Sequence, residues 1–165
     1  MPEAVVQFGK RIKSRHLLLV LSVALYVACL PRSAISLVGP RCSDWTGWEI
    51  LLLGWLGIYW LGMELSFSPA NMTWLANPVL FMAWMALYRK RNLRARCLSI
   101  IALLIGVFIF FDPKVNTPAS LDLSYRVTGE PPCQIAGYGI GYWLWLASMA
   151  TACVAGLVGI IVREG

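Results

Sequence analysis

Few side chains in this chain of 165 residues are suited to chemistry, and the clearest candidate is a carboxylate. Glu64 follows the apolar run 48–63 and stands just before the break Ser66-Phe67-Ser68-Pro69. Carboxylates at membrane depth often mark the path of an ion or a proton, because burying their charge is costly. Glu64 and the segment 64–71 are therefore the candidate ion path of a small transporter or channel. A carboxylate that only faces lipid headgroups is the alternative.

The five cysteines are the second set of reactive residues. Cys42 and Cys133 fall in polar loops, whereas Cys29, Cys97 and Cys153 lie in apolar runs or at their ends. In an oxidising compartment, two loop cysteines on the same side of a membrane readily form a structural bridge. We therefore predict a Cys42–Cys133 disulfide.

A redox enzyme is a weaker interpretation of the same cysteines. The predicted four spans and outer cysteines are similar to those of the quinone-linked membrane disulfide oxidoreductases, which use a Cys-x-x-Cys pair. None of the cysteines here has that spacing. Relaying electrons through thiol–disulfide exchange needs a second, exchangeable pair. A thiol–disulfide redox protein is thus the third functional hypothesis.

The sequence lacks the residues that other catalytic and ligand-binding motifs require. The single histidine, His16, sits among cations, so no histidine-based metal site or haem ligation is expected. The sequence contains no HExxH, phosphate loop or nucleophile elbow. Gly137-Tyr138-Gly139 lacks the lead-in of a potassium filter and is better explained as the entry to a tightly packed helix. We expect no enzyme, no cofactor and no metal.

The composition points to lipid as the natural solvent. Apolar residues make up 59% of the chain and charged residues 13%, with a mean hydropathy of +0.68. Soluble domains average about 45–50% apolar and about 25% charged residues. The formal net charge is +6, but most of the cations cluster beside apolar segments. That placement favours contact with lipid headgroups and predicts no nucleic-acid partner.

One basic stretch sets the orientation of the predicted spans. Residues 89–96 carry five cations between two apolar runs: Arg89, Lys90, Arg91, Arg94 and Arg96. Short basic loops between spans stay on the cytoplasmic side. Residues 1–16 form a second basic segment, a leader expected on the same side. The octet and both termini are therefore predicted to be cytoplasmic, in a bacterial inner membrane.

The apolar runs then predict an all-α integral membrane protein. Its crossings would be the run from Leu17 through Pro31 to Val38, and the runs 72–88, 97–111 and 143–162. Keeping the octet inside requires residues 48–71 to be re-entrant or interfacial on the outer face. The prediction is a four-crossing helix bundle with this additional helix. Five crossings are the alternative if residues 48–63 also span.

The remaining polar residues belong to one loop, so the whole of 1–165 is expected to be a single membrane domain. Residues 112–140 form its outer cap, with a short strand predicted at 121–127. The last span carries small residues at four-residue spacing: Ala147, Thr151, Ala155 and Gly159. Small residues let membrane helices approach closely, which predicts packing within the bundle, a homo-oligomer or a membrane-protein partner.

The leading functional hypothesis follows from what is present and what is missing. The sequence combines apolar segments and a small-residue stripe with no catalytic motif. We expect a non-enzymatic inner-membrane protein that works by helix–helix contact, as an accessory subunit, an assembly factor or an immunity-type protein.

Overall fold

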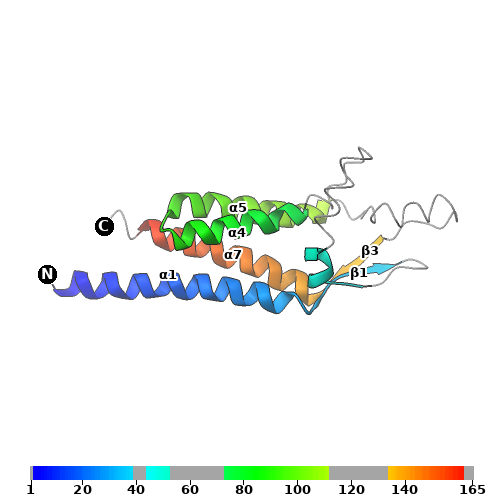
Figure 1. Ribbon diagram of the computed structural model, residues 1–165, viewed down its shortest axis with the longest axis horizontal. Coiled ribbons are helices and arrows are strands. Elements are labelled where there is room, and N and C mark those ends of the chain that lie inside the picture. The colour runs from blue at the N-terminus through cyan, green and yellow to red at the C-terminus, as the bar shows by residue number, and fades with distance from the viewer. Residues whose placement is uncertain (1, 39–43, 53–72, 112–133, 162–165) are drawn as a thin grey trace.

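The computed structural model describes residues 2–38, 44–52, 73–111 and 134–161. In this part of the chain, four helices lie along the long axis of the molecule (Figure 1). They are α1 (Pro2–Cys29), α4 (Ala76–Tyr88), α5 (Asn92–Val107) and α7 (Ile140–Ile161). The last helix, α7, packs against α1 and α5, and α4 packs against α5.

A small antiparallel sheet lies at one end of the helices (Figure 1). Its strands are β1 (Ser33–Val38), β2 (Trp45–Thr46) and β3 (Gln134–Tyr138), in the order β2-β1-β3. Ile35 pairs with Tyr138 and Val38 pairs with Gln134, so residues about a hundred positions apart share a ladder. Two short 3-10 helices, η1 (Thr73–Leu75) and η2 (Phe108–Phe111), adjoin α4 and α5.

The first helix ends earlier than the apolar run predicts. It was expected to continue through Pro31 to Val38, but it ends at Cys29 and the chain enters β1. Proline lacks a backbone N–H and disfavours helical geometry in the residue before it. The Arg32 N–H donates to the Cys29 carbonyl at 3.1 Å, which closes the turn between helix and strand.

The predicted four-crossing bundle is not supported, and the prediction of an all-α fold is wrong. A crossing helix needs about 20 apolar residues. Among the described residues, only Ile140–Val158 of α7, with 19 residues, is long and apolar enough, and half of that segment is buried in the fold. The helices α4 and α5 have 13 and 16 residues, and the apolar part of α1 is only Ser14–Cys29. The observed fold is mostly helical with a three-stranded sheet.

The five-crossing alternative has no support either, because it needs still more spanning helices than α7 alone. Of the predicted re-entrant segment 48–71, residues 48–52 are described and helical, and the rest lies outside the described residues. The strand predicted at 121–127 also lies outside them. The basic leader 1–16 is continuous with the following apolar run in α1.

Residues 89–91 of the basic octet form the turn between α4 and α5, and residues 92–96 begin α5, near the ends where α1 begins and α7 finishes (Figure 1). Lys90 has a positive φ of 58°. The Arg91 N–H donates to the Ala86 carbonyl at 2.9 Å, and the Lys90 N–H to the Leu87 carbonyl at 3.1 Å. These two bonds and the left-handed residue make a Schellman motif, the usual way to satisfy the last carbonyls of a helix.

Candidate functional site

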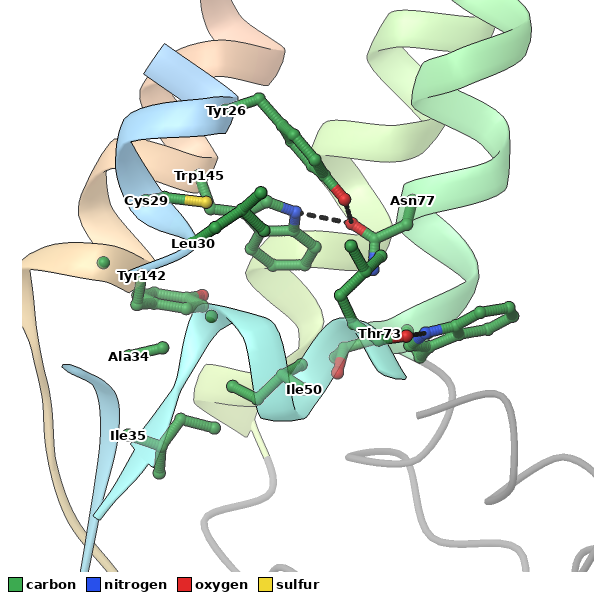
Figure 2. A pocket seen from close by; sticks show the side chains of 14 residues that line it. Tyr26, Cys29, Leu30, Ala34, Ile35, Ile50, Thr73, Asn77, Tyr142 and Trp145 are labelled. Carbon is green, nitrogen blue, oxygen red and sulfur yellow. Dashed lines mark hydrogen bonds between the residues drawn. The ribbon is translucent and has the colours of Figure 1, made fainter. Parts of the chain in front are cut away.

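A small pocket of about 40 Å³ lies where the helices meet the sheet (Figure 2). Its lining comes from α1, β1, η1, α4, α7 and the helical residues 47–52. The lining is mostly apolar and contains no charged side chain. An apolar pocket with a few convergent polar groups is the usual form of a small-molecule site.

One buried amide joins three helices at this pocket (Figure 2). The side chain of Asn77, on α4, is 3% exposed. Its Oδ1 accepts a hydrogen bond from the Tyr26 hydroxyl of α1 at 3.2 Å and one from the Trp145 indole N–H of α7 at 2.8 Å. Hydrogen bonds between side chains of neighbouring helices hold apolar helices in register.

The indole fixes which way the Asn77 amide points. An indole N–H can only donate, so the atom facing Trp145 must be the amide oxygen. Both lone pairs of Oδ1 are then occupied, by Tyr26 and Trp145. Within the described part of the chain, no residue accepts a hydrogen bond from the Asn77 nitrogen. The amide therefore offers the pocket two donors and no acceptor.

The part of the pocket wall that residues 47–52 form is positioned by a helix cap. The Thr46 N–H and hydroxyl donate to Glu49 Oε2 at 2.7 and 2.9 Å, and the Glu49 N–H donates to Thr46 Oγ1 at 3.4 Å. This reciprocal arrangement is a capping box, encoded as Thr-x-x-Glu. It begins the helical residues that carry Ile50 and Leu51 to the pocket. The Trp74 indole donates to the Leu51 carbonyl at 3.1 Å and ties this segment to η1.

A second set of polar contacts continues along the same helices away from the sheet. The Ser22 hydroxyl of α1 donates to the Ser148 carbonyl of α7 at 2.7 Å and accepts from the Trp84 indole of α4 at 2.9 Å. Ser148 Oγ is buried, and no residue that the structure describes forms a hydrogen bond with it. Ser22, Tyr26 and the asparagine of α4 thus form a polar seam between α1, α4 and α7.

Aromatic rings line the junction between the pocket and the sheet. The Tyr142 hydroxyl donates to the Gly106 carbonyl of α5 at 2.8 Å. Its ring lies 4.7 Å from that of Tyr138 on β3 and 5.5 Å from that of Phe110 on η2. Burial raises the pKa of the Tyr138 phenol above its ordinary value. These contacts hold the pocket end of α7 against α5 and the sheet.

The predicted headgroup-binding cations are gathered at the opposite end of the helices. Arg89, Lys90, Arg91 and Arg94 are exposed, and Arg96 is half-buried. A sixth cation at this end comes from α1: half-buried Arg15 donates a hydrogen bond to Asn92 Oδ1 at 3.1 Å. The structure thus brings a cation from α1 beside the basic turn, an arrangement that sequence spacing did not indicate.

The predicted helix-packing residues occupy different environments on α7. Ala155 is fully buried, whereas Ala147 and Thr151 are half-buried. The Thr151 hydroxyl donates to the Ala147 carbonyl at 2.7 Å, so its polarity is satisfied within the helix. Gly159 lies in α7, at the end of the described segment. The parallel row of Ser148, Ala152 and Gly156 is buried and faces the interior.

Two predicted sites fall outside the described residues: the disulfide between Cys42 and Cys133, and the ion path at Glu64 with segment 64–71. No disulfide is found among the described residues, where Cys29, Cys97 and Cys153 are free thiols. The predicted disulfide therefore has no structural support. No group of three or more metal-ligating side chains occurs in the described ranges.

Sequence reasoning missed the residues that build the pocket. Asn77 is the one amide side chain within the apolar run 72–88, in the first turn of α4, and a polar residue within such a run is a signal of a functional or packing role. Its partners Tyr26 and Trp145 look like ordinary members of apolar helices. Only the three-dimensional packing shows that they meet at one oxygen.

Comparison with protein-family models, with curated proteins and with solved structures finds no match to this chain.

Proposed function

We propose that the protein is embedded in a membrane, with α7 as its spanning helix, and that it works by contact with other membrane helices. Accessory subunit, assembly factor and immunity-type protein are the roles that fit such a protein. The proposal rests on one observation: within the described residues, the interior is built mainly from small or polar side chains and the outer surface carries large apolar ones.

The interior allows helices to approach closely. Seven alanines are buried on the three later helices: Ala76, Ala83, Ala86, Ala95, Ala102, Ala152 and Ala155. Ser22, Ser99 and Ser148 are completely buried as well. In lipid, helices gain little by hiding large apolar side chains, so small residues and interhelical hydrogen bonds hold them together.

The outer surface has the opposite composition. Its exposed large apolar side chains come from all four helices and include Leu17, Val20, Val27, Phe81, Met82, Met85, Ile101, Leu104, Trp143 and Val154. Soluble monomers rarely expose a contiguous apolar patch larger than a few hundred square ångströms. An apolar exterior around a small and polar interior is favourable when the surroundings are acyl chains.

The contact face is assigned to the exposed side of α7. Trp143, Ala150, Val154 and Leu157 recur at helical spacing and are all exposed. Ala150 lies at the middle of this face and next to half-buried Thr151. A small residue flanked by larger apolar ones gives a neighbouring helix a place to approach the backbone of α7.

Membrane embedding is tested by photolabelling in intact membranes with a carbene reagent that partitions into acyl chains. Mass spectrometry should find label on exposed Val154 and Leu157 of α7 and none on buried Leu146 and Met149 of the same helix. The membrane fraction should also keep the protein through an alkaline wash. Release by the wash, or equal labelling of the buried and exposed pairs, would overturn the proposal.

Contact through α7 is tested by placing a photo-crosslinking amino acid at Ala150. The matched control is the same substitution at Leu104, which is 65% exposed on α5. Light should give a discrete adduct, with a second copy or with another membrane protein, from position 150 alone. Thr151→Leu should abolish that adduct by crowding the face. Adducts of equal yield from both positions, or none from position 150, contradict the contact mechanism.

A further inference from the structure

We propose that the pocket between the helices and the sheet binds an uncharged, mostly apolar molecule through a hydrogen-bond-accepting oxygen, with the Asn77 amide nitrogen as the donor. The geometry around Asn77 carries this inference, and it does not depend on how the protein works in the membrane. The ligand class follows from three properties of the pocket: its donors, its lack of charge and its size.

The free N–H groups of the Asn77 amide favour a ligand that carries a hydrogen-bond acceptor. Asn77 Oδ1 already receives hydrogen bonds from Tyr26 and Trp145, so it has no lone pair for a ligand. Two N–H bonds of the amide remain, and no described residue accepts from them. The nitrogen lies on the side of the amide away from those two donors (Figure 2). A carbonyl oxygen, with two lone pairs, matches this site.

A purely structural role for Asn77 explains its amide oxygen but not its NH₂ group. Holding α1 and α7 in register requires only the oxygen of Asn77. Asn77 lines the pocket, and its N–H groups are destabilising if they lose water without gaining another partner. Native proteins pair such groups with protein, water or ligand. An oxygen that enters the pocket supplies the missing partner.

The lining excludes charged ligands. No lining side chain is ionised at neutral pH, and the apolar wall includes Leu30, Ala34 and Ile50. Moving an ion into such surroundings without a counter-charge is strongly unfavourable. The rings of Trp145 and Tyr142 could attract a cation by their faces, so a cation of similar size is a necessary comparison.

The space limits the part of the ligand that enters. The pocket volume is about 40 Å³. One ordered water needs roughly 10–15 Å³ by this measure, so the space is about three times larger. A group of about four non-hydrogen atoms, such as a methyl ketone, fits. A larger molecule would have to leave its remainder outside.

Acetone is the probe, because it is small and uncharged and has one acceptor and no donor. The full chain, labelled with ¹⁵N at asparagine, is titrated in mild detergent while the side-chain amide signals are recorded by NMR. The Asn77 NH₂ signals should shift saturably, with half-saturation in the millimolar range. The signals of Asn92, whose Oδ1 receives a hydrogen bond from Arg15, serve as the internal reference. Tetramethylammonium, the cationic comparison, should leave the Asn77 signals in place.

Two variants separate binding from folding. Ile50 is half-buried and lines the pocket, so Ile50→Trp replaces an aliphatic side chain there by a larger indole. This variant should bind acetone about tenfold or more weakly, while the amide signals of Asn77 persist. Leu52→Trp is the matched control, because Leu52 is in the same helical segment, is 58% exposed and does not line the pocket. It should bind acetone as the unmodified protein does.

Any one of four results would overturn the proposal. The first is a linear shift of the Asn77 signals, without saturation and equal to that of Asn92. The second is a shift of similar size with tetramethylammonium. The third is unchanged acetone binding in Ile50→Trp. A complete absence of acetone-induced shifts also overturns it and would leave ordered water as the partner of the amide.

Discussion

The Trp145 indole N–H donates to Asn77 Oδ1 at 2.8 Å and connects α7 to α4 across the interior. The same oxygen accepts from Tyr26 of α1 at 3.2 Å. Three helices that are distant in sequence are therefore joined at one atom. Since α4 packs mainly against α5, this atom is its principal polar link to α1 and α7 among the described residues.

Trp145→Phe should lower the free energy of unfolding by at least about 1 kcal/mol. Phenylalanine keeps an aromatic ring but removes the N–H and the second ring of the indole, so one lost hydrogen bond adds to a loss of packing. Asn77→Ala should cost more, about 2–4 kcal/mol, because it leaves both donors buried without an acceptor. Unfolding of the purified protein in mixed micelles measures both.

The control for this prediction is Trp143→Phe. Trp143 lies two residues away on α7, is 53% exposed and makes ring contacts but no indole hydrogen bond in the described structure. Its replacement should change stability by less than about 0.5 kcal/mol. Equal losses at the two tryptophans would show that the bond to Asn77 contributes nothing.

Gly139→Ala should destabilise the junction of the sheet and α7, by about 1–3 kcal/mol. A Cβ at this position would collide with the Ser33 carbonyl oxygen, and the Gly139 N–H donates to the Ala34 carbonyl at 2.9 Å, so the backbone cannot move away freely. Thermal unfolding followed by circular dichroism is the measurement.

Gly137→Ala is the matched control, because it adds the same methyl group two residues earlier in β3, where nothing lies within 4 Å of the added Cβ. It should be neutral or slightly stabilising, since alanine has fewer unfolded conformations to lose. If both alanines are equally tolerated, β3 does not pack against β1 as described.

The sequence contains clear signals for the helices and weak ones for the sheet. Apolar runs at 72–88, 97–111 and 143–162 lie close to α4, α5 and α7, because long apolar runs dominate hydropathy. The observed bounds of these helices decide how many of them could cross a membrane, since among the described residues only α7 contains a segment of spanning length. The high apolar content predicted membrane spans at α4 and α5, but these two helices are too short to cross a membrane.

The strands could not be predicted from local pattern. Ser33–Val38 continues an apolar run, and its partner β3 is about a hundred residues away, so no local periodicity connects them. Pro31 was the available signal, because helices tend to end before proline. The pocket was hidden for the same reason: Asn77 and Trp145 are both visible in the sequence, but their 2.8 Å contact depends on packing.

Lys90→Gly should stabilise the α4–α5 turn by up to about 1 kcal/mol. Lys90 has a φ of 58° within the Schellman motif, where a side chain costs roughly 1 kcal/mol and glycine costs none. Lys90→Ala removes the same charge and keeps the Cβ, so it should not stabilise. Chemical unfolding of the three proteins gives the comparison. A glycine variant no more stable than the alanine variant would count against strain at this residue.

Arg91→Glu with Arg94→Glu should weaken retention of anionic lipid at the basic turn. Both side chains are exposed, and Arg15 approaches the same turn through Asn92, so the described part of this end is cationic. A cation near an anionic membrane surface contributes about 1 kcal/mol, so loss of two predicts a decrease in affinity of at least about tenfold.

Native mass spectrometry in mixed micelles of phosphatidylglycerol and phosphatidylcholine measures the retained lipid. Arg32→Glu is the matched control, because Arg32 is also exposed but lies between α1 and β1, at the sheet end of the fold. It should keep the preference for phosphatidylglycerol, and higher salt should reduce the difference between the lipids. If the double variant retains both lipids as the unmodified protein does, the octet has no role in headgroup binding.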